Sequence, residues 1–275
     1  MRPPGEFTFC QSGLVTIVSL SWSEWESGSE WAIVTSSELL FLVLAVLFAG
    51  FVQILAGFGF ALLSVPLMAL VIPTQEAVVI STVLGLLSSG LQTVKGIRDA
   101  DWPTVRRVTI AAFAGIPVGF VLYATLSADT LRLLLGIGVL IAVFLLIRGI
   151  DFVGRGPIIE WTAGFVSGAL ASSLSTNGPP LVFALQGRRL PIAVFRSTIN
   201  AIFVISGAAT AVVFAIAGDF DERVGIGIAA ALPALVIGVL AGFRARPFFD
   251  EERARRLVLG LLALAGVSAL VGAVL

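Results

Sequence analysis

The stretch Ser172-Ser173-Leu174-Ser175-Thr176-Asn177-Gly178-Pro179-Pro180 decides how this chain folds. Its residues are small, polar or helix-breaking, yet the segments on both sides of it are strongly apolar. Proline removes a backbone hydrogen-bond donor, and glycine adopts conformations that other residues avoid. Inside hydrocarbon, the backbone groups freed by such a break need partners within the protein or in a water-filled cavity. If the flanking segments lie in a membrane, the stretch is therefore a candidate binding site.

The composition predicts an integral membrane protein. Of the 275 residues, 58% are hydrophobic and only 12% are charged, whereas soluble domains are about 25% charged. The apolar runs are continuous, without the alternation of polar and apolar residues that a transmembrane β-barrel requires. We therefore expect an all-α, polytopic membrane protein.

The composition also excludes several kinds of chemistry. The chain has no histidine, and Cys10 is its single cysteine, so neither an intrachain disulfide nor a Cys/His zinc site can form. Catalytic Ser-His and Cys-His pairs are excluded for the same reason. The 17 basic and 17 acidic residues balance, which gives no indication of nucleic-acid binding. We expect no metal, no cofactor and no enzymatic activity.

Ten apolar segments follow an N-terminal region, separated by short charged or Gly/Pro-containing joints. A full crossing needs about 20 residues, so the second segment and, above all, the seventh are too short. The joints before these two carry no charge, which allows each to be a hairpin that turns at membrane depth. Residues 1–37 are expected to be a tail with tryptophans at the membrane interface, or an extension without a role. The predicted segments are 39–55, 58–72, 77–94, 105–126, 131–148, 158–174, 178–187, 192–217, 224–243 and 257–275.

An internal repeat divides these segments into two membrane units of five, residues 38–150 and 151–275. Because five is an odd number, the second unit enters the membrane from the opposite side, and the repeat is predicted to be inverted. A slowly growing offset between matched positions is what a duplication with small insertions gives. The matches are Ala49–Val52 with Ala163–Val166 and Pro66 with Pro180 at an offset of 114, Asp99 and Asp101 with Asp219 and Asp221 at 120, Gly115 and Gly119 with Gly238 and Gly242 at 123, and Gly136 with Gly260 at 124.

The basic residues agree with an inverted arrangement. Fourteen of the 17 fall in or beside the joints after the third, fifth, seventh and ninth segments, which share one side of the membrane. The other side keeps Arg2, Arg132 and Arg223. An excess of Lys and Arg marks the cytoplasmic side, so both termini are predicted to lie outside.

The two breaks are the first candidate for a substrate site. Interrupted segments at corresponding positions of inverted halves indicate where a transporter binds its substrate. The start of each half-helix offers unpaired N–H groups and partial positive charge to an anion. Close packing of small residues is the alternative interpretation, with about equal weight for the two glycines of the first break. The candidate residues of the breaks are Gln53, Gly57, Phe58, Gly59, Pro66, Ser173, Ser175, Thr176, Asn177, Gly178, Pro179 and Pro180.

Arg196 and Asn200, near the start of the eighth segment, are further candidates. A guanidinium that reaches inward can bind an oxyanion bidentately, whereas an arginine that extends to the membrane interface is the alternative. Lys95, at the inner end of the third segment, is a weaker candidate for an anion entry path. No carboxylate lies at the centre of a segment, as a proton relay would require. Those nearest to a segment end are interpreted as solvated joint residues: Asp99, Asp101 and Glu160.

These motifs resemble the sulfite exporter TauE/SafE family over about residues 40–275. The resemblance implies a bacterial inner-membrane permease that exports sulfite, organosulfonates or related small anions. Ser173 and Ser175 stand where the first half has glycines, a departure that bears on which anion is carried. The residues that carry the resemblance are Gly57-Phe58-Gly59, Pro66, Pro73, Ala77, Gly96 to Trp102, Gly115-Ile116-Pro117-Val118-Gly119, Gly164 to Gly168, and Asn177-Gly178-Pro179-Pro180.

The sequence therefore favours a secondary transporter of a small sulfur-containing anion that works by alternating access. Its partners are the anion and the lipid bilayer, and a homo-oligomer is one of the assemblies left open. A passive anion channel built on the same breaks is the alternative. A membrane enzyme is disfavoured, because the sequence offers no nucleophile–base pair and no metal site.

Overall fold

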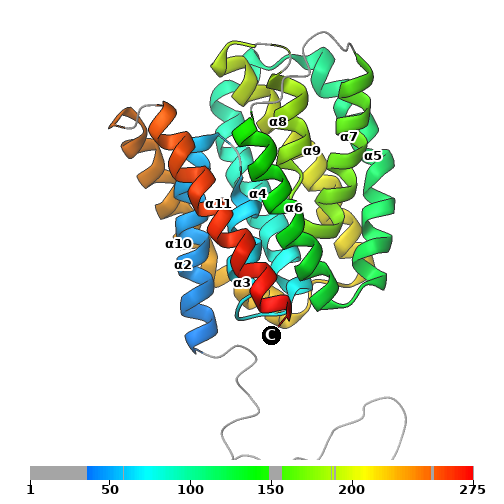
Figure 1. Cartoon of the computed structure of the whole chain (residues 1–275), viewed down its shortest axis with the longest axis vertical. Helices are drawn as coiled ribbons and strands as arrows, with labels where there is room; N and C mark the ends of the chain where they lie inside the picture. The colour runs from blue at the N-terminus through cyan, green and yellow to red at the C-terminus, as the bar shows by residue number, and fades with distance from the viewer. Residues whose placement is uncertain are drawn as a thin grey trace, which may run out of the picture. The chain divides into compact units, whose positions relative to one another are not determined.

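Ten α-helices make up most of the part of the chain that the computed structural model describes, residues 36–57, 59–148, 157–186, 188, 190–248 and 251–274 (Figure 1). This confirms the prediction of an all-α protein with ten segments. The predicted N-terminal tail lies outside the described residues up to residue 35. Two short 3₁₀ helices, η1 (Ile97–Asp99) and η2 (Arg246–Phe248), follow α4 and α10. The α-helices are α2 (Ser36–Ala56), α3 (Phe60–Met68), α4 (Thr74–Gly96), α5 (Trp102–Thr125), α6 (Ala128–Arg148), α7 (Pro157–Leu174), α8 (Gly178–Gln186), α9 (Ile192–Ala217), α10 (Glu222–Ala245) and α11 (Glu251–Val274).

Six of the described helices are long and apolar enough to cross a membrane, which makes this a multi-pass membrane protein. Large apolar side chains project outward from them, such as Ile216, which is 83% exposed, and Val121, which is 57% exposed. Such side chains suit hydrocarbon, because lipid tails are as apolar as leucine. The candidate spans are Ser37–Ala56, Thr74–Val94, Trp102–Thr125, Ala128–Leu145, Ile192–Ala217 and Glu222–Phe248.

The helices α3 and α8 are too short to cross, as the sequence predicts. Each has nine residues, which corresponds to about 14 Å of helix at 1.5 Å per residue, about half of the hydrocarbon thickness. Helix α3 packs against α2, and α8 packs against α7. Each short helix thus forms a hairpin with the helix that precedes it.

The two prolines matched by the sequence do not occupy equivalent positions. Helix α3 begins at Phe60 and α8 begins at Gly178, so Pro66 is the seventh residue of α3 and Pro180 is the third residue of α8. The pairing of these prolines at an offset of 114 is therefore wrong, because the two helices begin 118 residues apart. The two registers differ by about one helical turn, and a turn brings residues of a helix back to the same face. In segments rich in small residues, an alignment at an offset of 114 resembles one at 118, so the sequence pattern does not distinguish them.

Glycines bring two helix pairs into close contact. A Cβ added at Gly168 of α7 or at Gly119 of α5 would collide with the backbone of the facing helix, at Ala112 and Ala169 respectively. The pair α2 and α10 is built in the same way, because a Cβ at Gly238 would collide with the backbone of α2. Small residues at such contacts are typical of helices that pack inside membranes.

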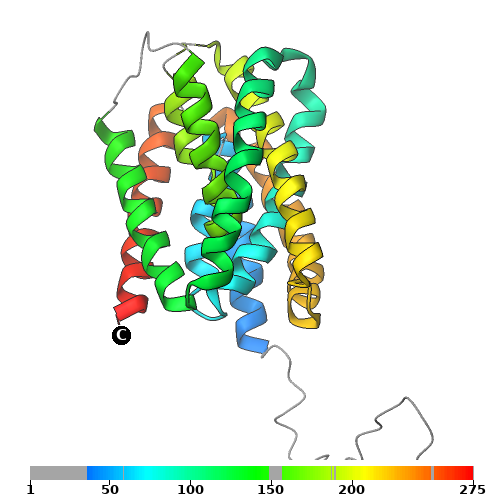
Figure 2. The same ribbon diagram turned by 90° about the vertical axis from the view of Figure 1, so that its right-hand side faces the viewer.

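Four of the described helices finish at the same end of this helical unit. The helices α4, α6, α8 and α10 all finish at the upper end in Figures 1 and 2, whereas α3, α5 and α9 finish at the lower end. The sequence predicts this grouping of the basic joints. The described helices lie within one compact unit, Val34–Leu275.

Candidate functional site

The two breaks share one backbone device. Helix α2 ends at Ala56, and Gly57 then takes φ +83° while its N–H donates to the carbonyl oxygen of Gln53 over 2.7 Å. Helix α7 ends at Leu174, and Ser175 takes φ +57° while its N–H donates to the carbonyl oxygen of Ala171 over 3.1 Å. A left-handed residue with this hydrogen bond is a common way to end a helix.

The second break uses a serine where the first uses a glycine. A non-glycine residue in the left-handed region costs about 1–2 kcal/mol, and such strain is found at functional sites. Ser175 thus ends α7 in the same region of backbone conformation in which Gly57 ends α2. Ser173 does not, because it lies in the last turn of α7, where its hydroxyl donates to the carbonyl oxygen of Ala169 over 2.7 Å.

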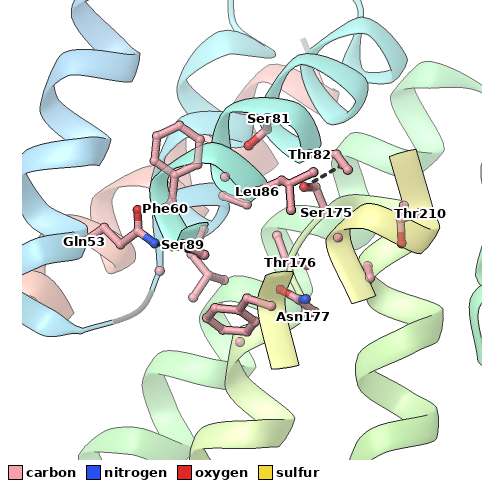
Figure 3. Close-up of a pocket in the computed structure, with 18 residues that line it drawn as sticks. Gln53, Phe60, Ser81, Thr82, Leu86, Ser89, Ser175, Thr176, Asn177 and Thr210 are labelled. Carbon is pink, nitrogen blue, oxygen red and sulfur yellow. Dashed lines mark hydrogen bonds between the residues drawn. The ribbon is translucent and has the colours of Figure 1, made fainter. Parts of the chain in front are cut away.

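A polar cavity of about 50 Å³ lies where the two breaks meet (Figure 3). The first turn of α3, from Gly59 to Leu62, lines one part of it, and Asn177 and Gly178 at the start of α8 line another. Both short helices thus begin at the same space. The polar side chains around it come from both halves of the chain: Gln53, Ser81, Thr82, Ser89, Ser175, Thr176, Asn177 and Thr210.

The helix starts give the cavity a positive potential without a charged side chain. The first N–H groups of a helix have no partner within it and carry partial positive charge. In α8 the second and third residues are Pro179 and Pro180, which have no N–H, so Gly178 is the only donor among the first three residues. Helix α3 begins Phe60-Ala61-Leu62 and has no such gap. None of the described residues that line the cavity is charged.

Side-chain hydroxyls also line the cavity. The hydroxyl of Thr82 donates to Val78 O over 2.8 Å and lies 3.0 Å from Ser175 Oγ. Thr210 is fully buried, and its hydroxyl has no hydrogen-bond partner among the residues that the structure describes. A buried hydroxyl without a partner costs free energy, so a bound ligand at this site would satisfy it.

Two amides hold the cavity wall in place. Ser88 donates to Gln53 Oε1 over 2.5 Å, and Gln53 Nε2 lies 3.4 Å from Ser89 Oγ. In the second half, Asn177 Nδ2 donates to Ser206 Oγ over 3.3 Å. Each amide nitrogen has two hydrogens, so each keeps donor capacity beyond these bonds.

The structure brings together about half of the predicted site residues. Gln53, Gly59 and the run Ser175–Gly178 line the cavity. Phe58 lies outside the described residues. The others do not line this cavity: Gly57, Pro66, Ser173, Pro179, Pro180, Arg196 and Asn200.

The sequence interpretation missed the hydroxyls of α4 and α9. Ser81 and Thr82 are followed seven residues later by Ser88 and Ser89, which places all four near one face of α4, two turns apart. Thr210 lies four residues after Ser206 on α9. Hydroxyls at helical spacing inside an otherwise apolar segment are the signal that identifies these positions.

Arg196 lies beside the first break and does not line the cavity. Its Nη2 donates to Leu55 O over 3.4 Å, whereas Nε and Nη1 are buried without a partner. A Cβ added at Gly57 would lie 3.0 Å from Nε. The guanidinium therefore stabilises the carbonyl end of α2, where unpaired oxygens carry partial negative charge. Asn200 donates from Nδ2 to Arg196 O over 2.8 Å.

A charged cluster lies at the end of the unit that carries the basic joints. Glu160 is 5% exposed and accepts from Arg107 Nε over 2.5 Å and from Arg188 Nη1 over 2.7 Å. Arg188 also pairs with Asp101 over 3.1 Å. The interpretation of Glu160 as a solvated residue is therefore wrong, because two guanidiniums stabilise its buried charge. The cluster connects α5, α7 and Arg188, which lies two residues after the end of α8.

This chain matches a known protein family. The family described as Sulfite exporter TauE/SafE matches residues 42–269. No curated protein and no solved structure matches. The family consists of membrane transporters rather than enzymes, and it implies a sulfur-containing anion as substrate. The match covers all of α3 to α10 and most of α2 and α11, so the chain belongs to the sulfite exporter TauE/SafE family.

Proposed function

We propose that this protein is a secondary transporter that exports sulfite, an organosulfonate or a related small sulfur-containing anion by alternating access. The polar cavity where α3 and α8 begin is its substrate site. The observation that carries this proposal is that both helix starts, with their unpaired N–H groups, line one cavity without a charged side chain. Helix starts bind anions for electrostatic reasons.

The size and chemistry of the cavity suit a small oxyanion. A volume of about 50 Å³ holds an anion of a few atoms rather than a large organic molecule. An oxyanion accepts several hydrogen bonds at once, and the buried hydroxyl of Thr210 and the half-buried amide of Asn177 both line the space. Hydrogen bonds to a charged partner each contribute about 1.5–3 kcal/mol.

An inverted repeat, residues 38–150 and 151–275, provides the two parts that move. Several features support it. Helices α4 and α9 begin 118 residues apart, after Pro73 and Pro191, whose backbone angles agree within 2°. Asp101 and Asp221 each precede the fourth helix of their unit. In each unit the first helix packs against the fourth helix of the other unit. Rocking of such units around a central site is how many secondary transporters work.

The basic end of the unit lies in the cytoplasm in this proposal. Fourteen of the 17 basic residues fall on the joints at that end, and such an excess marks the cytoplasmic side. Both termini then lie outside a bacterial inner membrane. Export would start with the anion entering from the side that carries Arg98, Arg106 and Arg244.

A matched pair of threonine variants tests the site. Thr210→Val removes a buried cavity hydroxyl and keeps the shape of the side chain. The loss of one hydrogen bond to an anion should weaken sulfite binding about tenfold, as measured by calorimetry on the purified protein. Thr109→Val is the control, because Thr109 is also buried with an unpaired hydroxyl but does not line the cavity. Equal affinities of the two variants would remove Thr210 from the site.

Asn177→Ala gives an independent check on the second break. It removes an amide donor from the start of α8 and should weaken binding by a similar factor. Unchanged affinity would remove this stretch from the site. Counterflow in liposomes then separates a carrier from a channel. Saturable exchange supports the carrier, and large single-channel currents would replace it with the channel.

A further inference from the structure

A second, apolar space adjoins the polar cavity. It is a groove of about 760 Å³ lined by residues of α6 and α7, and it also reaches α8. Its described lining is hydrocarbon, such as Ile137 and Ile141 of α6 and Val166 of α7, apart from the hydroxyls of Thr162, Ser173 and Thr176. Ligand sites are typically 300–1,000 Å³ in volume and mainly apolar with a few polar groups.

The groove and the cavity share a wall. Leu62, in the first turn of α3, and Thr176, in the second break, line both spaces. Pro179 and Pro180 line the groove from the first turn of α8, whose other residue, Gly178, lines the cavity. Helix α8 therefore presents its first residue to the cavity and an apolar side to the groove, whereas α3 reaches both spaces through Leu62.

We propose that the substrate class includes amphiphilic sulfonates, with the sulfonate in the polar cavity and the hydrocarbon tail in the groove. The inference rests on the proposed function of the cavity. The cavity alone holds only a head group, whereas the groove has room for a chain of many carbons. Leu62 and Thr176 are the side chains that must turn aside for the tail to pass. Burial of each methylene from water stabilises the complex, so affinity should rise with chain length.

The polar cavity next to the groove favours a substrate tail over a membrane lipid as the occupant of the groove. A lipid chain needs only an apolar surface, and it gains nothing from contact with the half-helix starts. Here the groove runs up to the wall of a neutral, donor-rich cavity, as a ligand with an anionic head and an apolar tail requires. A groove filled by a lipid chain would exclude the tail, and the experiment below separates the two cases.

The test is a chain-length series on the full-length protein in lipid nanodiscs. Affinities are measured for methanesulfonate, butanesulfonate, hexanesulfonate and octanesulfonate. The expected result is a rise of about fourfold for each fully buried methylene. An affinity that is independent of chain length, with methanesulfonate still bound, would overturn the inference and leave the proposed function intact. Absence of binding for sulfite and for every sulfonate would instead overturn the proposed function.

Two glycine variants show where the tail lies. Gly138 lines the groove, and a Cβ there meets nothing within 4 Å, so Gly138→Phe fills the groove without disturbing the packing. It should abolish the rise with chain length and leave the affinity for methanesulfonate unchanged. Gly260→Phe is the control, since Gly260 is also unobstructed but lies on α11 and does not line the groove. The same chain-length slope in both variants would show that the tail binds elsewhere and overturn the inference.

Discussion

At the scale of single residues, the two breaks depend on left-handed backbone at Gly57 and Ser175. Glycine adopts this conformation freely, whereas Ser175 adopts it because its hydroxyl and its N–H are both held by neighbours. The same residue both ends α7 and lines the cavity. Local strain and the proposed substrate site therefore coincide at Ser175.

Gly57→Ala should destabilise the protein. Alanine at φ +83° costs about 1–2 kcal/mol, and its Cβ would crowd Arg196 Nε at 3.0 Å. Thermal melting of the purified protein in detergent measures the effect. Gly90→Ala is the control with opposite sign, because Gly90 is within α4 with open space around it, and alanine favours a helix by about 1 kcal/mol. A Gly57→Ala protein that melts as high as the wild type would contradict the prediction.

The joint between α9 and α10 contains a carboxyl that the fold disfavours in its charged form. Burial raises the pKa of Asp219 and the nearby charge of Asp221 raises it further, against a hydrogen bond from Tyr123 that lowers it. An acid whose pKa is raised in the folded state makes the fold less stable as pH rises through that pKa. Asp219 thus opposes folding at neutral pH.

Asp219→Asn should therefore raise the melting temperature at pH 7. The gain should shrink as the pH falls towards the ordinary aspartate pKa of 3.8, because the wild-type carboxyl is then protonated. Melting curves between pH 4 and about pH 8 give the comparison. Asp129→Asn is the control: Asp129 is exposed in the first turn of α6, where negative charge is favourable, so no gain is expected. A gain that is independent of pH would refute the electrostatic cause.

At the scale of helices, close packing between α5 and α7 positions the second break. Gly164 and Gly168 of α7 meet the backbone of α5, and Gly115 and Gly119 of α5 meet the backbone of α7. Ser172 Oγ also donates to Ile116 O over 2.7 Å. The last turns of α7, from which Ser175 and Thr176 reach the cavity, are thus fixed to a long helix.

Gly168→Ala should separate these two helices. Its Cβ would overlap the backbone of Ala112, which a rotamer change cannot relieve, and overpacking of this kind costs about 1–3 kcal/mol. The expected result is a lower melting temperature and weaker sulfite binding. Gly138→Ala, where a Cβ meets nothing, should leave both unchanged or raise the melting temperature. Full stability of Gly168→Ala would show that the helices can move apart without cost.

At the scale of the whole molecule, the orientation in the membrane can be tested with the natural cysteine. Cys10 is the only cysteine, and the proposed topology places the N-terminus outside. A membrane-impermeant maleimide should therefore label the wild-type protein in intact cells. In the variant Cys10→Ser/Arg98→Cys, label should enter only after permeabilisation, because Arg98 is exposed in η1 at the basic end. The reverse pattern would invert the topology.

Much of the fold could be predicted from the sequence, because membrane helices are recognisable from short stretches of neighbouring residues. Apolar length marks the segments, and proline or charge marks their ends, as at Pro73 and Pro191. The site was predictable where helix-breaking and polar residues coincide, at Asn177 and Gly178. The helical spacing of the hydroxyls marks Thr82 as a member of a polar face, but only the fold places it 3.0 Å from Ser175.

The sequence by itself determined the membrane class, the ten segments, the two short helices and the break that opens the site. These follow from the composition of neighbouring residues, which the chain carries whatever its fold. Only the tertiary structure decided that the starts of the two short helices meet and which donors share a cavity, and it also decided that Glu160 is buried between two arginines. These features depend on contacts between residues far apart in the chain. A shift of one helical turn changes such contacts, and a stretch of small residues gives no sign of that shift.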